Sequence, residues 1–302
     1  MRTVIALMVG LVLGAGSVQA ADAVRVGSKL DAESGLLGTI ILQVLEANGI
    51  PTENKVQLGP TKIVRSALLA GEIDIYPEYT GNGAFFFNLD QEAVWKNAAA
   101  GYEKVRQLDR EKNAIVWLKP APANNSWAIA LRGDVAAKGG LATMEDFSRW
   151  VASGGPAKIA ASAEFVESPA ALPSFQQAYG FALKPEQILV LAGGDTAATI
   201  RAAAEGTSGV NTAMVYGTDG AISALGLVVM KDTKGAQMVY EPAPTVRASV
   251  LEAQPKIRDV LEPVFASLDA ETLRTLNARI SVEGQDIAQV ATSYLTSKGF
   301  LK

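Results

Sequence analysis

The stretch that decides the fold is residues 23–49, AVRVGSKLDAESGLLGTIILQVLEANG. Its valine-rich beginning, Ala23 to Gly27, predicts a short β-strand. A polar loop is expected from Asp31 to Ser34. From Leu36 onward the apolar residues recur at helical spacing, and Asn48-Gly49 supplies the helix stop. The stretch therefore predicts a strand, a loop and a helix in succession.

The same plan recurs along the chain. A second unit is expected to contain a strand at 56–58, a helix over Thr61–Ala70 ended by Gly71, and a strand at 73–76. Alternating strands and helices with short joints predict an α/β fold with mainly parallel sheets. The later expected elements are strands at 127–131, 158–161 and 188–191, and helices near 143–152 and 171–179.

Two polar stretches marked by proline, 120–126 and 240–246, are expected to be crossovers between two halves of the chain. The chain then leaves a first lobe, builds a second and returns. This predicts a lobe 1 of residues 21–126 plus 240–302 and a lobe 2 of residues 127–239. The C-terminal helices, expected near 255–267, 269–278 and 286–299, are predicted to pack on lobe 1.

The first twenty residues have the layout of a cleavable signal peptide. Arg2 precedes an apolar run, and small residues follow up to Ala20. The run is shorter than the roughly 20 residues that a bilayer span needs, and glycines interrupt it. We expect cleavage after Ala20 and export, without a lipid anchor, because the chain contains no cysteine that a lipid could modify.

The chain has neither histidine nor cysteine. This excludes Ser-His triads, thiolate nucleophiles and the usual zinc sites, and we expect no cofactor or metal. Carboxylate catalysis stays open, since Glu72 with Asp74 or Glu78 offers acid pairs of unknown separation. An exported hydrolase of that kind is the competing class. The net charge of -4 does not indicate the basic surface that is typical of nucleic-acid-binding proteins.

Four aromatic residues lie beside predicted turns or strand ends: Tyr79, Trp127, Tyr216 and Tyr240. The carboxyl ends of strands are where open α/β sheets bind ligands. Ring faces attract a cation that carries no hydrogen-bond donor, such as a quaternary ammonium group. Each ring alone is equally explained by packing. Their shared location favours a cage for a quaternary ammonium ligand.

Five motifs recur in a fixed order along the chain: Gly27-Ser28-Lys29, Asp74 to Gly81, Asn124-Asn125, Ala163-Glu164-Phe165 and Tyr216 to Gly220. With these motifs the chain resembles the substrate-binding proteins of glycine betaine/choline/proline betaine ABC importers, in particular the OsmF (YehZ) type of the Gram-negative periplasm. The resemblance runs over the mature chain in order. It implies a type II periplasmic-binding-protein fold, with two α/β lobes joined by two crossover strands and a ligand cleft between them. It also implies a periplasmic location and delivery of the ligand to membrane permease subunits.

The resemblance also assigns site residues. The aromatic cage falls on Tyr79, Trp127, Tyr216 and Tyr240, where Trp127 replaces the tyrosine of relatives. The polar ligand-binding residues fall on Lys29, Asn82 and Thr218, with Ser34 in place of a frequent glutamine. Lys29 is the residue expected to bind a ligand carboxylate.

Ser168 stands where many relatives carry an arginine. Loss of a charged hydrogen bond of this kind costs roughly 1.5–3 kcal/mol, so the carboxylate end of the predicted site has fewer donors. We expect a monomeric binding protein, not an enzyme, for glycine betaine or a related osmolyte. The alternatives are choline, carnitine, proline betaine or another small cationic solute.

Overall fold

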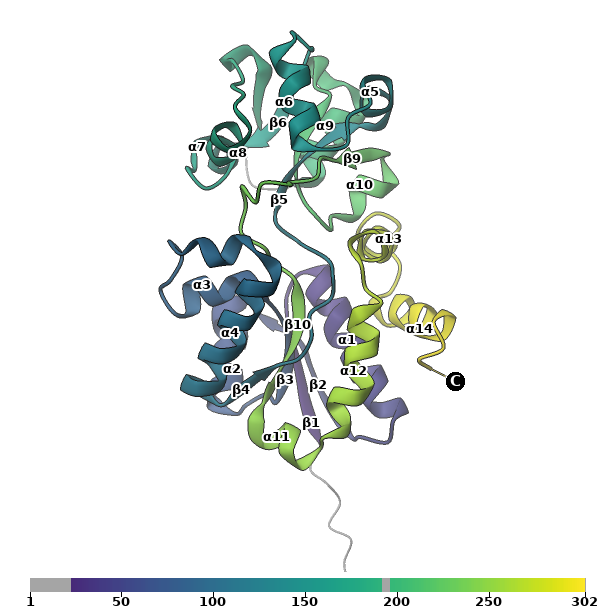
Figure 1. The fold of residues 1–302 in the computed structure, drawn as a ribbon. Helices are drawn as coiled ribbons and strands as arrows, with labels where there is room; N and C mark the ends of the chain where they lie inside the picture. The colour runs from purple at the N-terminus through teal and green to yellow at the C-terminus, as the bar shows by residue number, and fades with distance from the viewer. Residues whose placement is uncertain (1–22, 192–195, 302) are drawn as a thin grey trace, which may run out of the picture.

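The computed structural model describes residues 23–191 and 196–301 (Figure 1). Two five-stranded sheets, each flanked by helices on both faces, lie one above the other and are linked by extended segments. The predicted two-lobed α/β fold is confirmed. The predicted signal segment, 1–20, lies outside the described residues, and the exact lobe boundaries remain a prediction.

The sheet of lobe 1 has the strand order β2-β1-β3-β10-β4. In Figure 1, α2 and α4 cover one face, and α1 and α12 cover the other. Its strands are β1 Val24–Lys29, β2 Thr52–Gly59, β3 Ile75–Tyr79, β4 Ile115–Trp117 and β10 Pro242–Arg247. Its helices are α1 Ala32–Ala47, α2 Thr61–Ala70, α3 Gly83–Phe86, α4 Ala98–Asn113, α11 Ala248–Ala253, α12 Lys256–Ala266, α13 Ala270–Ser281 and α14 Ile287–Ser297.

The sheet of lobe 2 has the order β7-β6-β8-β5-β9, the same arrangement as in lobe 1. Its strands are β5 Trp127–Arg132, β6 Ile159–Ser162, β7 Ile188–Leu191, β8 Thr212–Tyr216 and β9 Leu227–Val229. Its helices are α5 Gly133–Gly139, α6 Met144–Ala152, α7 Ala163–Glu167, α8 Leu172–Tyr179, α9 Thr196–Glu205 and α10 Gly220–Ala224.

Each sheet is mainly parallel, as predicted, but one inner strand of each runs in the opposite direction. In lobe 1, β10 runs antiparallel to β3 and β4, and in lobe 2, β5 runs antiparallel to β8 and β9. Each of these strands enters its sheet from the other lobe, at the edge where the neighbouring strands end. It therefore has to run the opposite way. Most of the predicted crossover 240–246 is β10 itself.

Helix α1 begins at Ala32, so the predicted loop from Asp31 to Ser34 is wrong. Asp31 is the N-cap, and its Oδ1 accepts a hydrogen bond of 2.8 Å from the backbone N–H of Ser34. An N-cap aspartate satisfies one of the free N–H groups of a first helical turn. Glu33 and Ser34 consequently project from the first turn of a rigid helix that starts at the end of β1.

Each lobe has its own hydrophobic core. In lobe 1 the side chains of Leu36, Leu37, Ile40 and Ile41 are fully buried against β1, β3 and the C-terminal helices. Burial of one such side chain stabilises a protein by about 1.5–3 kcal/mol. None of the helices in the described ranges is long and apolar enough to cross a membrane.

Helix α13 packs on lobe 1, as predicted, and also contacts lobe 2. It packs against α1 of lobe 1 and against α10 of lobe 2. A Cβ atom added at Gly220 would lie 2.3 Å from the backbone nitrogen of Ala278. Only glycine permits so close an approach of two backbones. The side of the cleft formed by α13 is therefore a tight contact between the lobes.

Asp74 joins three strands of lobe 1 at their ends far from the cleft. Its carboxylate accepts hydrogen bonds from the Arg25 guanidinium at 2.8 Å and from Arg247 at 3.1 Å. Burial alone would raise the pKa of Asp74, but the hydrogen bonds and charge of Arg25, with the Arg247 hydrogen bond, hold it below its ordinary value.

We expect Asp74→Asn to lower the free energy of unfolding by about 1.5–3 kcal/mol near neutral pH, the scale of a charged hydrogen bond. A lowered pKa stabilises the fold above the pKa of the unfolded chain, and this gain is lost as the pH falls through the folded value. The difference between wild type and variant in urea unfolding should therefore shrink below about pH 4. A difference that grows on acidification would contradict this role.

Candidate functional site

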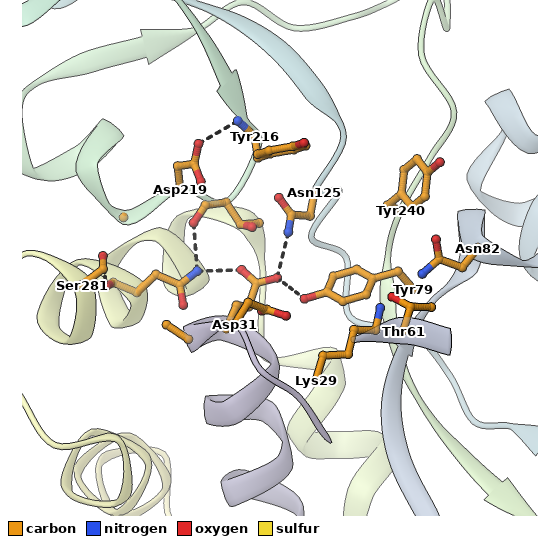
Figure 2. Close-up of a pocket in the computed structure, with 15 residues that line it drawn as sticks. Lys29, Asp31, Thr61, Tyr79, Asn82, Asn125, Tyr216, Asp219, Tyr240 and Ser281 are labelled. Atoms are coloured by element: carbon orange, nitrogen blue, oxygen red, sulfur yellow. Dashed lines mark hydrogen bonds between the residues drawn. The ribbon is translucent and has the colours of Figure 1, made fainter. Parts of the chain in front are cut away.

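A cavity of about 530 Å³ lies between the two lobes, and its residues are drawn in Figure 2. It is lined by side chains from the ends of β1, β3 and β8, from the crossovers and from α13. Six of the eight predicted ligand-binding residues line it: Lys29, Tyr79, Asn82, Tyr216, Thr218 and Tyr240. Ser34 and Trp127 are not among the lining residues.

The three tyrosines come from both lobes. Tyr79 is the last residue of β3, and Tyr216 is the last residue of β8. Tyr240 lies on the second crossover, where its ring packs on Gly81: a Cβ atom added there would lie 2.7 Å from two ring carbons. Burial raises the pKa of Tyr240 to about 12, so this phenol stays neutral. Neutral rings from three segments therefore face one cavity.

Trp127 lies behind the ring of Tyr216. It pairs directly with Tyr216 across β5 and β8, and the two rings stack with centroids 6.2 Å apart and planes at 23°. Its indole also meets Phe165 edge to face at 5.9 Å. The structure thus places Trp127 against the Tyr216 ring and not on the cavity wall.

Lys29 is engaged within the protein. Its Nζ lies 2.5 Å from Glu78 Oε1 and 4.5 Å from the centre of the Tyr79 ring. The same Glu78 oxygen accepts a hydrogen bond of 2.8 Å from Asn82 Nδ2. Lys29, which was expected to bind a ligand carboxylate, therefore already binds a carboxylate of the chain, and so does the predicted polar residue Asn82. An ammonium group has three N–H donors, so Lys29 keeps donors for a ligand.

Glu78 is fully buried and takes two further hydrogen bonds, from the Tyr76 hydroxyl at 2.8 Å and from the Tyr79 backbone N–H at 2.7 Å. Its partners come from β1, from β3 itself and from the turn after β3. A buried carboxylate with this many donors fixes their positions. Sequence reasoning treated Glu78 only as a possible catalytic acid and missed this role.

Glu33 is the second buried acid that sequence reasoning missed. Its Oε1 accepts from the Tyr79 hydroxyl at 2.6 Å and from Asn125 Nδ2 at 3.2 Å, and its Oε2 accepts from Asn277 Nδ2 at 2.6 Å (Figure 2). Burial raises the pKa of Glu33. Hydrogen bonds from Thr218, Tyr79 and Asn277 act to lower it but do not cancel the effect of burial. The carboxylate thus joins lobe 1 to the crossover, to α13 and to lobe 2.

Ser34 and Ser168, which stand where relatives often carry glutamine and arginine, are not among the residues that line the cavity. Ser34 is fully buried in the first turn of α1, and Ser168 is the C-cap residue of α7, where its N–H donates to Glu164. Thr61 does line the cavity, at the start of α2. Its position directly after the end of β2 is the sequence signal that could have identified it.

The charged side chains that line the cavity are more acidic than basic. Within the described ranges they are Lys29, Asp31, Glu33 and Asp219. The charge of Lys29 is balanced by Glu78. The remaining acidic side chains, which form the acidic wall of the cavity, therefore favour a ligand with positive charge over an anion.

A family model described as the substrate binding domain of ABC-type glycine betaine transport systems matches residues 22–297. The chain is 60% identical over 285 residues to the glycine betaine-binding protein YehZ of Escherichia coli K12, covering 94% of this chain and 93% of that protein. It is 31% identical over 289 residues to a glycine-betaine-binding protein of Pseudomonas aeruginosa, covering 94% of this chain and 90% of that protein.

The structure is similar to that of apo YehZ from Escherichia coli, with a TM-score of 0.90 and 60% sequence identity. The match covers 93% of this chain and 100% of that one. The predicted family resemblance and the type II periplasmic-binding-protein fold are both confirmed.

Proposed function

Because the chain belongs to the family of substrate-binding domains of ABC-type glycine betaine transporters, which are binding proteins and not enzymes, we propose that it captures glycine betaine in the cavity between its lobes. The trimethylammonium group lies against the rings of Tyr79, Tyr216 and Tyr240. The carboxylate lies toward Lys29, Asn82 and Thr61. The ligand undergoes no covalent change.

The convergence of three tyrosine rings from both lobes on one cavity carries this proposal. Each ring contributes about 0.5–2 kcal/mol to the binding free energy of a cation that is removed from water. Trp127 extends the stack behind Tyr216 at 6.2 Å. The acidic wall adds a favourable potential for the cationic end.

Choline is the second candidate, favoured by the engagement of Lys29 and Asn82 with Glu78. A ligand without a carboxylate does not have to compete for these donors. The same titration with each ligand ranks the two candidates.

We further propose that the chain is exported to the periplasm with cleavage after Ala20, works as a monomer and delivers its ligand to the permease subunits of an ABC transporter. The family assignment and the layout of residues 1–20 support this role. Neither nucleic acid nor a cofactor takes part in it.

Tyr240→Leu tests the cage with little disturbance elsewhere. The Tyr240 hydroxyl has only a weak contact of 3.9 Å to the Met238 sulfur, so loss of the ring is the main change. We expect the Kd for glycine betaine, measured by calorimetric titration, to rise about tenfold, which corresponds to about 1.4 kcal/mol for one ring.

Tyr240→Phe is the matched control, because it keeps the ring and removes only the hydroxyl. Its Kd should stay within about threefold of wild type. Unchanged betaine affinity in Tyr240→Leu, or equal losses in both variants, would contradict the cage.

A further inference from the structure

Asn277 on α13 connects the two halves of the cage. Its Nδ2 donates one hydrogen bond of 2.6 Å to Glu33 Oε2 in lobe 1 and another of 2.9 Å to the Thr218 backbone carbonyl in lobe 2 (Figure 2). The side chain is buried, with 6% of its surface exposed. Both contacts are therefore shielded from water.

The chemistry of the two partners fixes the orientation of this amide. A carboxylate that accepts other hydrogen bonds and a backbone carbonyl are both acceptors, so only the NH₂ group can face them. The Asn277 Oδ1 is left buried, with no hydrogen-bond partner among the described residues. An asparagine is thus required for its two donors, and an ionised aspartate of the same shape would supply none.

The contacts on either side of Asn277 lead to the cage rings. Glu33 also accepts the hydrogen bond of the Tyr79 hydroxyl at 2.6 Å, and so holds the far end of that ring. On the lobe 2 side, Thr218 follows Tyr216 by two residues. Arg274 Nε, one turn before Asn277, donates to the Gly217 carbonyl at 2.7 Å. One face of α13 therefore holds the loop that directly follows Tyr216.

We propose that Asn277 is a positioning residue for ligand binding: its amide sets the spacing between Tyr79 and Tyr216 by tying Glu33 to the loop after β8. This rests on the proposed cage. Asn277 does not itself touch the cation. It holds two rings from different lobes at the separation that a trimethylammonium group requires.

Asn277→Asp is the decisive variant, because it keeps the shape, removes both donors and places a second carboxylate next to Glu33. We expect the Kd for glycine betaine at about pH 8 to rise about tenfold or more, the scale of a lost charged hydrogen bond. Two adjacent carboxylates take up a proton more readily than one, so the affinity should recover as the pH is lowered toward about 5.

The other titratable or charged groups near this pair belong to Asp31, Tyr79, Asp219, Lys29 and Arg274. They are the same in wild type and variant, so the wild-type profile over this range is the baseline for them. A purely structural defect would lower the stability of the fold without adding a pH dependence to the affinity of the folded protein.

The double variant Glu33→Gln with Asn277→Asp reverses donor and acceptor, since the new amide on α1 donates to the new carboxylate on α13. It should bind betaine more tightly than Asn277→Asp alone at about pH 8 and should lose the pH dependence.

Asn97→Asp is the control for the charge change. Asn97 caps α4 through its side-chain oxygen, which aspartate retains, and it does not line the cavity. Its betaine affinity should equal that of wild type.

A betaine Kd for Asn277→Asp within about twofold of wild type at about pH 8, together with a clear loss in Tyr240→Leu, would overturn this proposal and leave the cage intact. Normal binding in Tyr240→Leu would instead overturn the proposed function. Where Asn277→Asp does not fold, Asn277→Ser is measured in its place, and wild-type affinity in that variant would equally overturn the role of Asn277.

Discussion

Arg65→Leu is expected to lower the free energy of unfolding by about 3–5 kcal/mol, the usual cost of breaking a buried ion pair. The Arg65 guanidinium binds Asp109 through two hydrogen bonds of 2.8 and 2.5 Å, and Asp109 is fully buried. Without the arginine, the buried negative charge of the aspartate loses its guanidinium partner. Urea unfolding near neutral pH measures the loss.

The rest of this network explains why the loss should be large. Asp109 also accepts a hydrogen bond of 2.6 Å from Trp117 Nε1 and one of 2.8 Å from Asn113 Nδ2, and the Arg65 guanidinium lies 4.5 Å from the centre of the Phe86 ring. The pair thus joins α2, α4 and β4 within lobe 1. Removal of one partner disturbs all of these contacts.

Arg65→Leu combined with Asp109→Leu is the control. Replacing both members of a buried pair by apolar groups avoids the unpaired charge, so the double variant should be more stable than Arg65→Leu alone. A single-variant loss below about 1 kcal/mol would show that water reaches the pair and that the network contributes little.

Much of the fold could be predicted because local patterns determine it. The helix Thr61–Ala70 was predicted with its observed bounds, since Gly71 adopts the left-handed conformation, φ 74°, that ends it. The loop expected at Asp31 was wrong because the N-cap role of this residue was missed. The direction of β10 depends on which lobe the chain arrives from, which no local pattern reveals.

The tyrosines that line the cavity could be predicted from their place beside strand ends and crossovers and from the family resemblance. Glu33 and Asn277 could not, because their contact joins residues 244 positions apart in the sequence. An acidic residue near the start of a helix is usually explained by its favourable interaction with the helix dipole. Only the packing of α13 against both lobes brings Glu33 and Asn277 together.

The three rings and the acidic wall together predict strong discrimination by charge. Tert-butylacetate has the shape and the carboxylate of glycine betaine, but its central carbon replaces the charged nitrogen. It keeps the apolar contacts and loses the attraction of the ring faces, about 0.5–2 kcal/mol for each ring. Its net negative charge also faces Asp31, Glu33 and Asp219. We expect it to bind at least about thirtyfold more weakly than betaine, since three rings together supply roughly 2 kcal/mol or more.

The most direct test of the cage is therefore a pair of calorimetric titrations of the wild-type protein, one with glycine betaine and one with tert-butylacetate. We expect saturable binding of betaine and a Kd for tert-butylacetate that is at least about thirtyfold higher. Equal affinity for the two ligands would show that the cavity recognises shape and carboxylate alone, and would contradict capture of the cation by the tyrosine rings.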